Sequence, residues 1–219
     1  MTKALNMNKR KKSYSFAFLG TDGSGKSTII SHITPVLNNV YPDTVYYEHL
    51  RPNLFPSIAR LLGKKDEFND PVTNPHSKNP SGTFGSLFRW SYYLLDYTIG
   101  YGLKVFPKKI FTSCVWIFDR YYYDYRLDKR RTRVDLPDWV LKFGQWIIPE
   151  PDIIFCLGAD PEIIFARKPE LPLEEVQRQV EKLKLFSIDK KKAIWIDTSD
   201  SIEKSVEDVI LAINNLTNK

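Results

Sequence analysis

Residues 20–27 have the types and spacing that suit the binding of a polyphosphate. They read G-T-D-G-S-G-K-S and match the pattern G-x-x-x-x-G-K-[ST] at every fixed position. Glycines let such a loop turn tightly and aim its backbone N–H groups at phosphate oxygens, while Lys26 reaches the outer phosphates and the Ser27 hydroxyl holds Mg²⁺. We therefore predict that this loop binds a nucleoside triphosphate with Mg²⁺. The predicted phosphate ligands are Asp22, Gly23, Ser24, Gly25, Lys26, Ser27 and Thr28.

The segments on either side of the loop support this prediction. Residues 14–19 form a short apolar run typical of a strand, and residues 26–38 can form a helix. A helix that begins at the loop adds its N-terminal partial positive charge to the phosphate site. The alternative is a glycine turn that only joins a strand to a helix, but the complete pattern in this context favours nucleotide binding.

A second group of residues with chemical potential, Asp119, Arg120 and Tyr121, follows the apolar run 114–118. In a parallel sheet, ligands bind beyond the carboxyl ends of the strands, so we expect Asp119 and Arg120 to lie level with the glycine loop. A carboxylate suits Mg²⁺, and a guanidinium grips phosphate through two parallel hydrogen bonds. Alternatively, the two side chains pair with helix ends and have a purely structural role.

Apolar, strand-like runs recur along the chain at residues 14–19, 44–50, 114–118, 152–157 and 193–196, with helical patterns between or after them. This alternation predicts an α/β fold with three layers, in which a parallel sheet of about five strands is flanked by helices. We expect a single domain at residues 13–219, preceded by a basic, flexible tail at residues 1–12. Within the domain, a proline-rich insert at about residues 52–85 has little periodicity and is expected to form a long loop.

The composition excludes several classes of protein. Apolar residues make up 42% of the 219 residues, which is typical of a globular chain rather than a disordered one. The net charge of +6 arises mostly from the tail, which holds five of the 32 basic residues and no acid, so 27 basic and 26 acidic residues remain. This near balance argues against a nucleic-acid-binding protein. The two cysteines lie in apolar runs and indicate neither a disulfide framework nor a zinc site, and the tail lacks the apolar core of a secretory signal, so we expect a cytoplasmic protein.

Residues 84–106 are rich in Leu, Tyr and Trp, but charges at Arg89, Asp96 and Lys104 make a membrane span unfavourable. We therefore expect a long buried helix and no membrane partner. Its apolar residues recur at steps of three and four and form one stripe. Arg89, Tyr93 and Asp96 lie on the opposite side, which we expect to line a pocket rather than to face water.

A basic cluster follows the D-R-Y motif and consists of Arg126, Lys129, Arg130, Arg131 and Arg133. Acidic residues interrupt and flank this cluster, which is typical of a solvated face. His49 stands near the end of a predicted strand, where the wall of a polar pocket is a simpler role for it than that of a catalytic base.

A third motif, P-D-I-I-F-C-L-G-A-D-P-E, spans residues 151–162 and is followed by Arg167. Here a strand ends and a helix begins, with Asp160 as the N-cap and Pro161 at the first helical position. Together and in this order, the three motifs resemble those of the thymidylate kinase family of nucleoside monophosphate kinases. The resemblance extends over roughly residues 14–215, although the middle third matches poorly.

The resemblance implies roles in holding a phosphorylated acceptor. In this family the loop aspartate, here Asp22, contacts the sugar side of the acceptor. An arginine after the second strand grips the acceptor phosphate, and Arg51 in H-L-R-P is the matching residue. The D-R-Y motif and the long helix imply Arg120, Tyr121 and Arg89 as further acceptor residues.

The resemblance also implies a donor side for ATP. A small lid at about residues 167–180 carries Arg167 over the transferring phosphoryl group and toward the adenine. Asp197 and Thr198, at the end of the last strand, are implied to approach the adenine as well. The implied catalytic residues are Lys26, Asp119, Arg120 and Arg167, and the implied Mg²⁺ ligands are Ser27 and Asp119.

We therefore expect an ATP- and Mg²⁺-dependent phosphotransferase that converts dTMP and ATP to dTDP and ADP, or that uses a related acceptor. The sequence departs from the family at the acceptor side, where R-E-P is replaced by L-R-P and the insert is long. A kinase of the same fold for a sugar, a nucleoside or a sugar phosphate is therefore an alternative. A nucleotide-binding module without turnover is another, and a nucleic-acid-linked ATPase is disfavoured by the near-neutral body. The resemblance also suggests a homodimer through helices beside the sheet.

Overall fold

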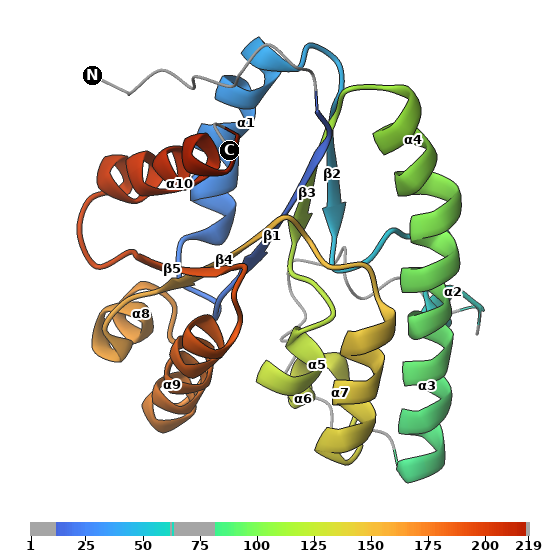
Figure 1. Ribbon diagram of the computed structural model, residues 1–219. Helices are drawn as coiled ribbons and strands as arrows, with labels where there is room; N and C mark the ends of the chain where they lie inside the picture. The colour runs from blue at the N-terminus through green and yellow to red at the C-terminus, as the bar shows by residue number, and fades with distance from the viewer. Residues whose placement is uncertain (1–11, 62, 64–81, 218–219) are drawn as a thin grey trace.

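The computed structural model describes residues 12–61, 63 and 82–217 (Figure 1). Almost all of the predicted basic tail and most of the predicted insert lie outside the described residues. Five parallel strands form one sheet in the order β2-β3-β1-β4-β5. They are β1 (Tyr14–Leu19), β2 (Val45–His49), β3 (Val115–Asp119), β4 (Ile153–Gly158) and β5 (Ala193–Asp197). The predicted α/β fold with a five-stranded parallel sheet is confirmed, and each predicted strand is present to within about one residue.

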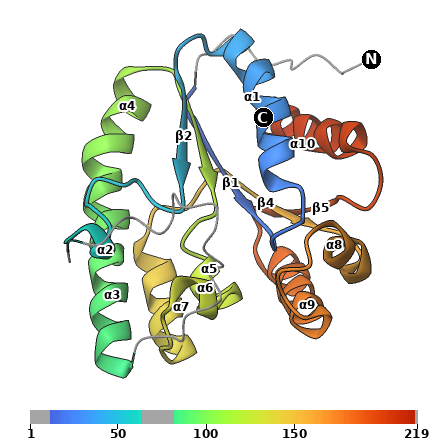
Figure 2. The ribbon, with the colours of Figure 1, turned by 180° about the vertical axis from the view of Figure 1, so that it is seen from behind.

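Helices cover both faces of this sheet (Figures 1 and 2). On one side lie α1 (Lys26–Val40) and α10 (Ile202–Thr217). A long rod lies on the other side and consists of α3 (Thr83–Leu95), the π-helix η2 (Asp96–Val105) and α4 (Phe106–Phe111). The remaining helices are α2 (Ile58–Leu61), α5 (Asp124–Leu127), α6 (Lys129–Thr132), α7 (Asp138–Ile147), α8 (Pro161–Arg167) and α9 (Leu173–Asp189).

The central strand β1 divides its side chains between two apolar cores. Phe16 and Phe18 pack into the core that α1 and α10 complete, whereas Ala17 and Leu19 pack into the core on the side of the long rod. Successive strand residues point to opposite faces, so an uninterrupted apolar run buries both faces of a parallel sheet. The rings of Phe18 and Phe155 stack with their centroids 4.9 Å apart and so join β1 to β4. This packing fixes the edge of the sheet from which the glycine loop departs.

The long rod buries a different face from the one that the apolar spacing predicts. Trp90, Tyr93 and Tyr97 are buried, whereas Phe84 is 90% exposed and Phe88 is 63% exposed. The expectation of a helix buried on its apolar stripe is therefore wrong, and the aromatic face packs inward. Its rings meet other aromatic rings edge to face, as Tyr97 does with Tyr121 and Tyr122 at centroid distances of 5.2 and 5.5 Å.

A buried carboxylate explains why this face points inward. Asp96 is 0% exposed and forms an ion pair with Arg51, and its Oδ1 accepts the backbone N–H groups of Leu54 and Phe55 at 2.9 and 3.0 Å. A buried charge needs such partners, and these three all belong to the loop after β2. Gly100 permits this close approach, because a Cβ there would lie 2.7 Å from Oδ1 of Asp96. Among the described residues, no helix is both long enough and apolar enough to cross a membrane.

Candidate active site

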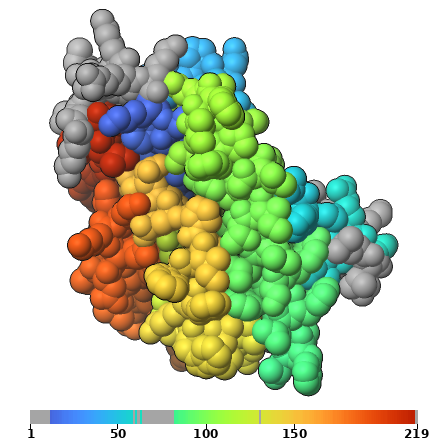
Figure 3. All heavy atoms as spheres, turned by 45° about the vertical axis from the view of Figure 1, so that its right-hand side comes forward, coloured from blue at the N-terminus to red at the C-terminus, as the bar shows by residue number. Residues whose placement is uncertain are grey.

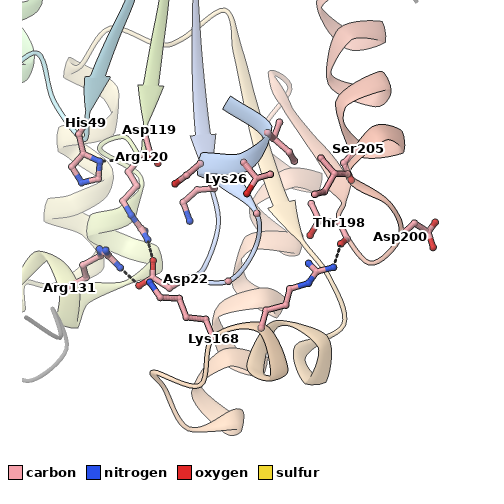
Figure 4. A pocket seen from close by; sticks show the side chains of 17 residues that line it. Asp22, Lys26, His49, Asp119, Arg120, Arg131, Lys168, Thr198, Asp200 and Ser205 are labelled. Carbon is pink, nitrogen blue, oxygen red and sulfur yellow. Dashed lines mark hydrogen bonds and ion pairs between the residues drawn. The ribbon is translucent and has the colours of Figure 1, made fainter. Parts of the chain in front are cut away.

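A cavity of about 570 Å³ opens at the carboxyl end of the sheet (Figure 4). We call it the edge cavity. The glycine loop and the start of α1 form its floor, the ends of β2 and β3 form one wall, and the ends of α8 and β5 form the other. Its lining residues are Asp22, Gly23, Gly25, Lys26, Ser27, Thr28, Ile29, His49, Asp119, Arg120, Arg131, Arg167, Lys168, Thr198, Asp200, Ile202 and Ser205.

The glycine loop has a backbone that only glycines adopt easily. Gly23 and Gly25 have φ angles of +87° and +83°, in the left-handed region. A Cβ on Gly23 would also lie 2.9 Å from the carbonyl oxygen of Ile164 on α8. The helix α1 begins directly after this turn at Lys26, and the exposed Ser27 and Thr28 line the edge cavity. The loop therefore presents a helix N-terminus to the cavity, as the sequence predicts.

Lys26 lies almost fully beneath the loop and is 7% exposed. Its ammonium donates hydrogen bonds to the carbonyl oxygens of Gly20 and Thr21 at 2.8 and 2.9 Å. Burial and the nearby Arg120 charge lower the pKa of Lys26 to about 7, although neighbouring carboxylates act against this shift. An ammonium group has three donors, so the two carbonyl bonds leave one for a ligand in the cavity.

Asp22 lies between two guanidinium groups. Its Oδ1 accepts a hydrogen bond from Nη2 of Arg120 at 2.8 Å, and its Oδ2 accepts one from Nη1 of Arg131. Nη1 of Arg120 pairs in turn with Oδ2 of Asp124 at 2.8 Å. Burial disfavours the charged form of Asp22, but the charges of Arg120, Arg131 and Lys26 outweigh it and lower the pKa of this carboxyl well below its ordinary value.

Asp119 faces the cavity from the end of β3. Its Oδ2 accepts a hydrogen bond from the Tyr47 hydroxyl at 2.9 Å and lies 3.7 Å from Nδ1 of His49. Its Oδ1 is buried and has no hydrogen-bond partner among the described residues. Burial opposes ionisation, but the His49 ring and the charge of Lys26 dominate, and the pKa of Asp119 falls to about 2. The carboxylate is therefore charged at neutral pH, and one of its oxygens has no hydrogen-bond partner among the described residues.

These groups fit Mg²⁺ held largely by phosphate oxygens and water. Ser27 offers an exposed hydroxyl, and Asp119 offers the unpartnered Oδ1. Within the described ranges, no three His, Cys, Asp or Glu side chains gather into a metal-binding cluster. Mg²⁺ typically keeps several waters and takes one or two protein ligands beside phosphates, so this sparse donor set suits it.

The opposite wall of the cavity carries Arg167 and Thr198. Nη2 of Arg167 donates to the carbonyl oxygen of Thr198 at 2.9 Å, and the Thr198 hydroxyl oxygen is buried without a partner among the described residues. Asp197, predicted for this wall, does not line the cavity, and its Oδ1 instead accepts the backbone N–H of Ser199 at 2.8 Å. The second half of the predicted lid is the start of α9, where Val176 and Val180 are buried.

Three predicted acceptor residues lie away from the edge cavity. Arg51 is 6% exposed, pairs with Asp96 and donates to the Phe55 carbonyl oxygen at 2.8 Å. Tyr121 is fully buried and donates its hydroxyl to the carbonyl oxygen of Pro149 at 2.7 Å. Nε of Arg89 is buried with no partner among the described residues. Of the predicted acceptor residues, only Asp22 and Arg120 line the cavity. Ser24, which is one of the predicted phosphate ligands, is buried and does not line it.

Sequence reasoning missed several lining residues, of which Arg131 has the most consequence. The basic cluster is typical of a solvated face, yet α6 turns Arg131 into the cavity. Oδ1 of Asp128 accepts the backbone N–H of Arg131 at 3.1 Å and so caps this short helix, but this local pattern does not indicate that the Arg131 side chain enters the cavity. Asp200, Ile202 and Ser205 follow β5 and carry no comparable motif.

Comparison with known proteins supports the fold. No family model matches the sequence, and no curated protein matches it. Among solved structures, thymidylate kinase from Ehrlichia chaffeensis is similar over 91% of this chain and 98% of its own, with a TM-score of 0.58 at 16% sequence identity. At that identity the likeness concerns the fold. The resemblance inferred from the three motifs is thus confirmed at the level of architecture: the chain has the fold of a thymidylate kinase.

Proposed function

We propose that this protein is an ATP- and Mg²⁺-dependent phosphotransferase that acts on a small phosphorylated acceptor, as nucleoside monophosphate kinases do. One observation carries the proposal: a single cavity is lined by residues of the phosphate loop, by Arg120 and by Arg167. Phosphoryl transfer depends on positioning and on stabilising negative charge, rather than on covalent catalysis. The edge cavity supplies both means.

On the donor side, the loop amides, Lys26 and the α1 N-terminus hold the polyphosphate. Lys26 is already directed along the loop by its two carbonyl bonds, so little reordering is needed when a phosphate approaches. Bound Mg²⁺ would neutralise charge on the two outer phosphates, with Ser27 and Asp119 as its protein contacts. On the opposite wall of the cavity, we assign Arg167 to the charge of the transferred group and Thr198 to the base end of the donor.

On the acceptor side, Asp22 and Arg120 are the supporting residues. The acceptor oxygen attacks the terminal phosphate of the donor and displaces ADP, and an ionised phosphate acceptor needs no strong general base for this step. Thymidine monophosphate is the first acceptor to test, because the fold is that of a thymidylate kinase. A different phosphorylated acceptor is the second candidate, since Asp96 retains Arg51 outside the cavity.

A panel of acceptors tests the proposal. The full chain is incubated with Mg-ATP and, in turn, with nucleoside monophosphates, nucleosides and sugar phosphates, and ADP release is followed. We expect at least one phosphorylated compound to stimulate release above the rate with water alone. Stimulation by dTMP alone supports a thymidylate kinase. Release that no acceptor stimulates, together with tight binding of Mg-ATP, would support a nucleotide-binding module instead.

The exposed apolar stripe of the long rod supports a homodimer. Phe84, Phe88 and Leu103 are 90, 63 and 67% exposed, and Trp139 and Trp146 on α7 are 72 and 87% exposed. Figure 3 shows the rod and α7 side by side on one face of the molecule. Several large apolar side chains exposed on two neighbouring helices are typical of an interaction site. We propose a second copy of this chain as the occupant, because one straight helical stripe can pair with itself about a twofold axis.

A further inference from the structure

The carboxylate of Asp22 occupies the space between Arg120 and Arg131. Its Oδ1 accepts a hydrogen bond from Nη2 of Arg120 at 2.8 Å, and its Oδ2 accepts one from Nη1 of Arg131 (Figure 4). All three side chains line the edge cavity, and Asp22 belongs to the phosphate loop itself. Two arginines that face one small anion from two sides form the arrangement that proteins use to bind phosphate. Here the anion is supplied by the protein.

Arg120 is a rigid member of this pair. Its φ angle of +72° places it in the left-handed region, which costs a non-glycine residue on the order of 1–3 kcal/mol. The backbone holds this conformation, since its N–H donates to the carbonyl oxygen of Phe18 at 2.9 Å. Nη1 is occupied by Asp124, so Nη2 is the group that meets Asp22. The strained backbone thereby aims one guanidinium edge into the cavity.

Arg131 is held differently. Its backbone is fixed by the Asp128 cap at 3.1 Å, but its side chain is 18% exposed and comes from a helix of only four residues. Nη1 of Arg131 pairs with Asp22 across 109 residues of sequence. Arg131 therefore has the freedom to follow an anion that replaces the Asp22 carboxylate, while Arg120 stays in place.

The charges favour such a replacement. A carboxylate carries one negative charge and a phosphate monoester up to two, with three oxygens to accept from guanidinium groups. Arg51, which the family resemblance implies as a further ligand of the acceptor phosphate, instead forms an ion pair with Asp96. Among the described cavity-lining residues, Arg131 is thus the remaining arginine on the Arg120 side.

We propose that Arg131 and Arg120 form the clamp for the phosphate monoester of the acceptor, and that Asp22 holds this clamp closed until the phosphate takes its place. This inference rests on the proposed function and adds Arg131 to the residues that hold the acceptor, as a partner of Arg120 for its phosphate monoester. It also assigns a second role to the loop aspartate, that of an internal competitor for the acceptor phosphate. No bond is made or broken in the exchange.

Inorganic phosphate is the probe that tests the clamp. The full chain is first saturated with Mg²⁺ and a non-hydrolysable ATP analogue, so that the phosphate loop is filled, and phosphate binding is then measured by calorimetry. Arg131→Gln should weaken phosphate binding by tenfold or more while affinity for the analogue changes little. Asp22→Asn should strengthen phosphate binding severalfold, because the neutral amide competes less well for the two guanidinium groups.

Arg126→Gln is the matched control. Arg126 lies on α5, pairs with Asp138 at 2.7 Å and does not line the cavity, so its loss removes the same charge without touching the clamp. Phosphate affinity should stay at the wild-type value. Melting temperatures of all variants show whether each is folded, and the opposite direction expected for Asp22→Asn does not depend on the stability of Arg131→Gln.

The proposal is overturned if Arg131→Gln binds phosphate as the wild type does, or if Asp22→Asn binds it more weakly. A lower melting temperature of Arg131→Gln with unchanged phosphate affinity would show that Arg131 stabilises the fold and does not bind phosphate. Absence of phosphate binding by the wild type also overturns it. A different result would contradict the proposed function. If the variants change phosphate affinity as expected but no acceptor stimulates ADP release, the transferase assignment is wrong, while the phosphate-binding site is still supported.

Discussion

Arg51 and Asp96 form an ion pair that is almost entirely removed from water, with the residues 6% and 0% exposed. The guanidinium also lies over the Tyr93 ring, 4.8 Å from its centroid. This pair ties the loop after β2 to the π-helical turn of the long rod. It explains both why the rod buries its aromatic face and why Arg51 lies outside the edge cavity.

Breaking this pair should destabilise the fold. In Asp96→Asn the Arg51 charge remains buried without a counter-charge, and we expect a loss of about 3–5 kcal/mol in the free energy of unfolding. Denaturant titration measures it. Asp138→Asn is the control, because Asp138 pairs with Arg126 at a site where its side chain is 51% exposed, and the loss there should stay below about 1 kcal/mol. Equal losses in the two variants would contradict the importance of the buried pair.

Binding of a polyphosphate should draw a proton onto Lys26. The pKa of this ammonium is about 7 rather than the ordinary 10.5 because of burial, so at about pH 8.5 it is largely neutral in the free protein. Phosphate oxygens beside it favour the charged form and raise this pKa again. Calorimetry of Mg-ADP binding in two buffers of different ionisation enthalpy should show uptake of close to one proton at about pH 8.5 and about half as much near pH 7. Equal heats in both buffers at the higher pH would rule this out.

The lowered pKa of Lys26 also predicts how the stability of the fold changes with pH. Between about pH 7 and 10, the unfolded chain holds the Lys26 proton more strongly than the folded chain does, so the contribution of Lys26 to stability rises with pH in that window. In Lys26→Met this contribution is removed. The difference in melting temperature between wild type and Lys26→Met should therefore move in favour of the wild type as the pH rises through this window. A constant difference would contradict a buried Lys26 that is a neutral amine above about pH 7.

Lys26→Ala should abolish turnover without unfolding the protein. The two carbonyl oxygens that it leaves, those of Gly20 and Thr21, belong to buried residues, but Lys26 itself lines the cavity, so truncation to Ala opens the space of its side chain to water that can replace the ammonium. Circular dichroism and ADP release measure the two effects. Lys142→Ala on α7, whose side chain is 61% exposed, is the charge-matched control and should keep full activity. Retention of most activity by Lys26→Ala would mean that the donor site lies elsewhere.

Arg167→Ala should lower kcat by about 10³-fold, the lower end of the range for arginines that stabilise a transferring phosphoryl group. A nucleotide-binding module would tolerate this change. The comparison is Arg178→Ala, which pairs with Glu175 along the surface of α9 and does not line the cavity. If Arg167→Ala raises only the KM for ATP and leaves kcat intact, Arg167 serves the base end of the donor through Thr198 and not the transferred group.

Phe88→Glu should abolish the proposed homodimer and leave a monomer. A charge in the centre of an apolar self-contact is paired with its own copy across the twofold axis, and both charges lose water. Light scattering measures the mass at several concentrations. Leu211→Glu on α10, at a site 44% exposed on the other side of the sheet, is the control and should leave the mass unchanged. A wild type that is monomeric at all concentrations refutes the dimer.

The sequence alone determined the phosphate loop, the order of the strands along the chain and the residues that end them. These are local properties: the glycine pattern requires left-handed backbone at Gly23 and Gly25, and apolar runs at regular intervals require buried parallel strands. Asp119, Arg120 and Thr198 could be placed at the cavity because the carboxyl ends of parallel strands share one edge of the sheet.

Only the tertiary structure decided which charges meet. Asp22 and Arg131 are 109 residues apart, and Arg51 and Asp96 are separated by 45, so no periodicity relates them. The apolar stripe of the long rod points outward because the opposite face buries its large aromatic side chains together with Asp96, which finds its counter-charge in Arg51, and a hydrophobic pattern does not contain this pairing. Long-range ion pairs depend on how elements dock, and for that reason the sequence placed Arg51 in the site and Arg131 outside it, whereas the folded chain has them the other way round.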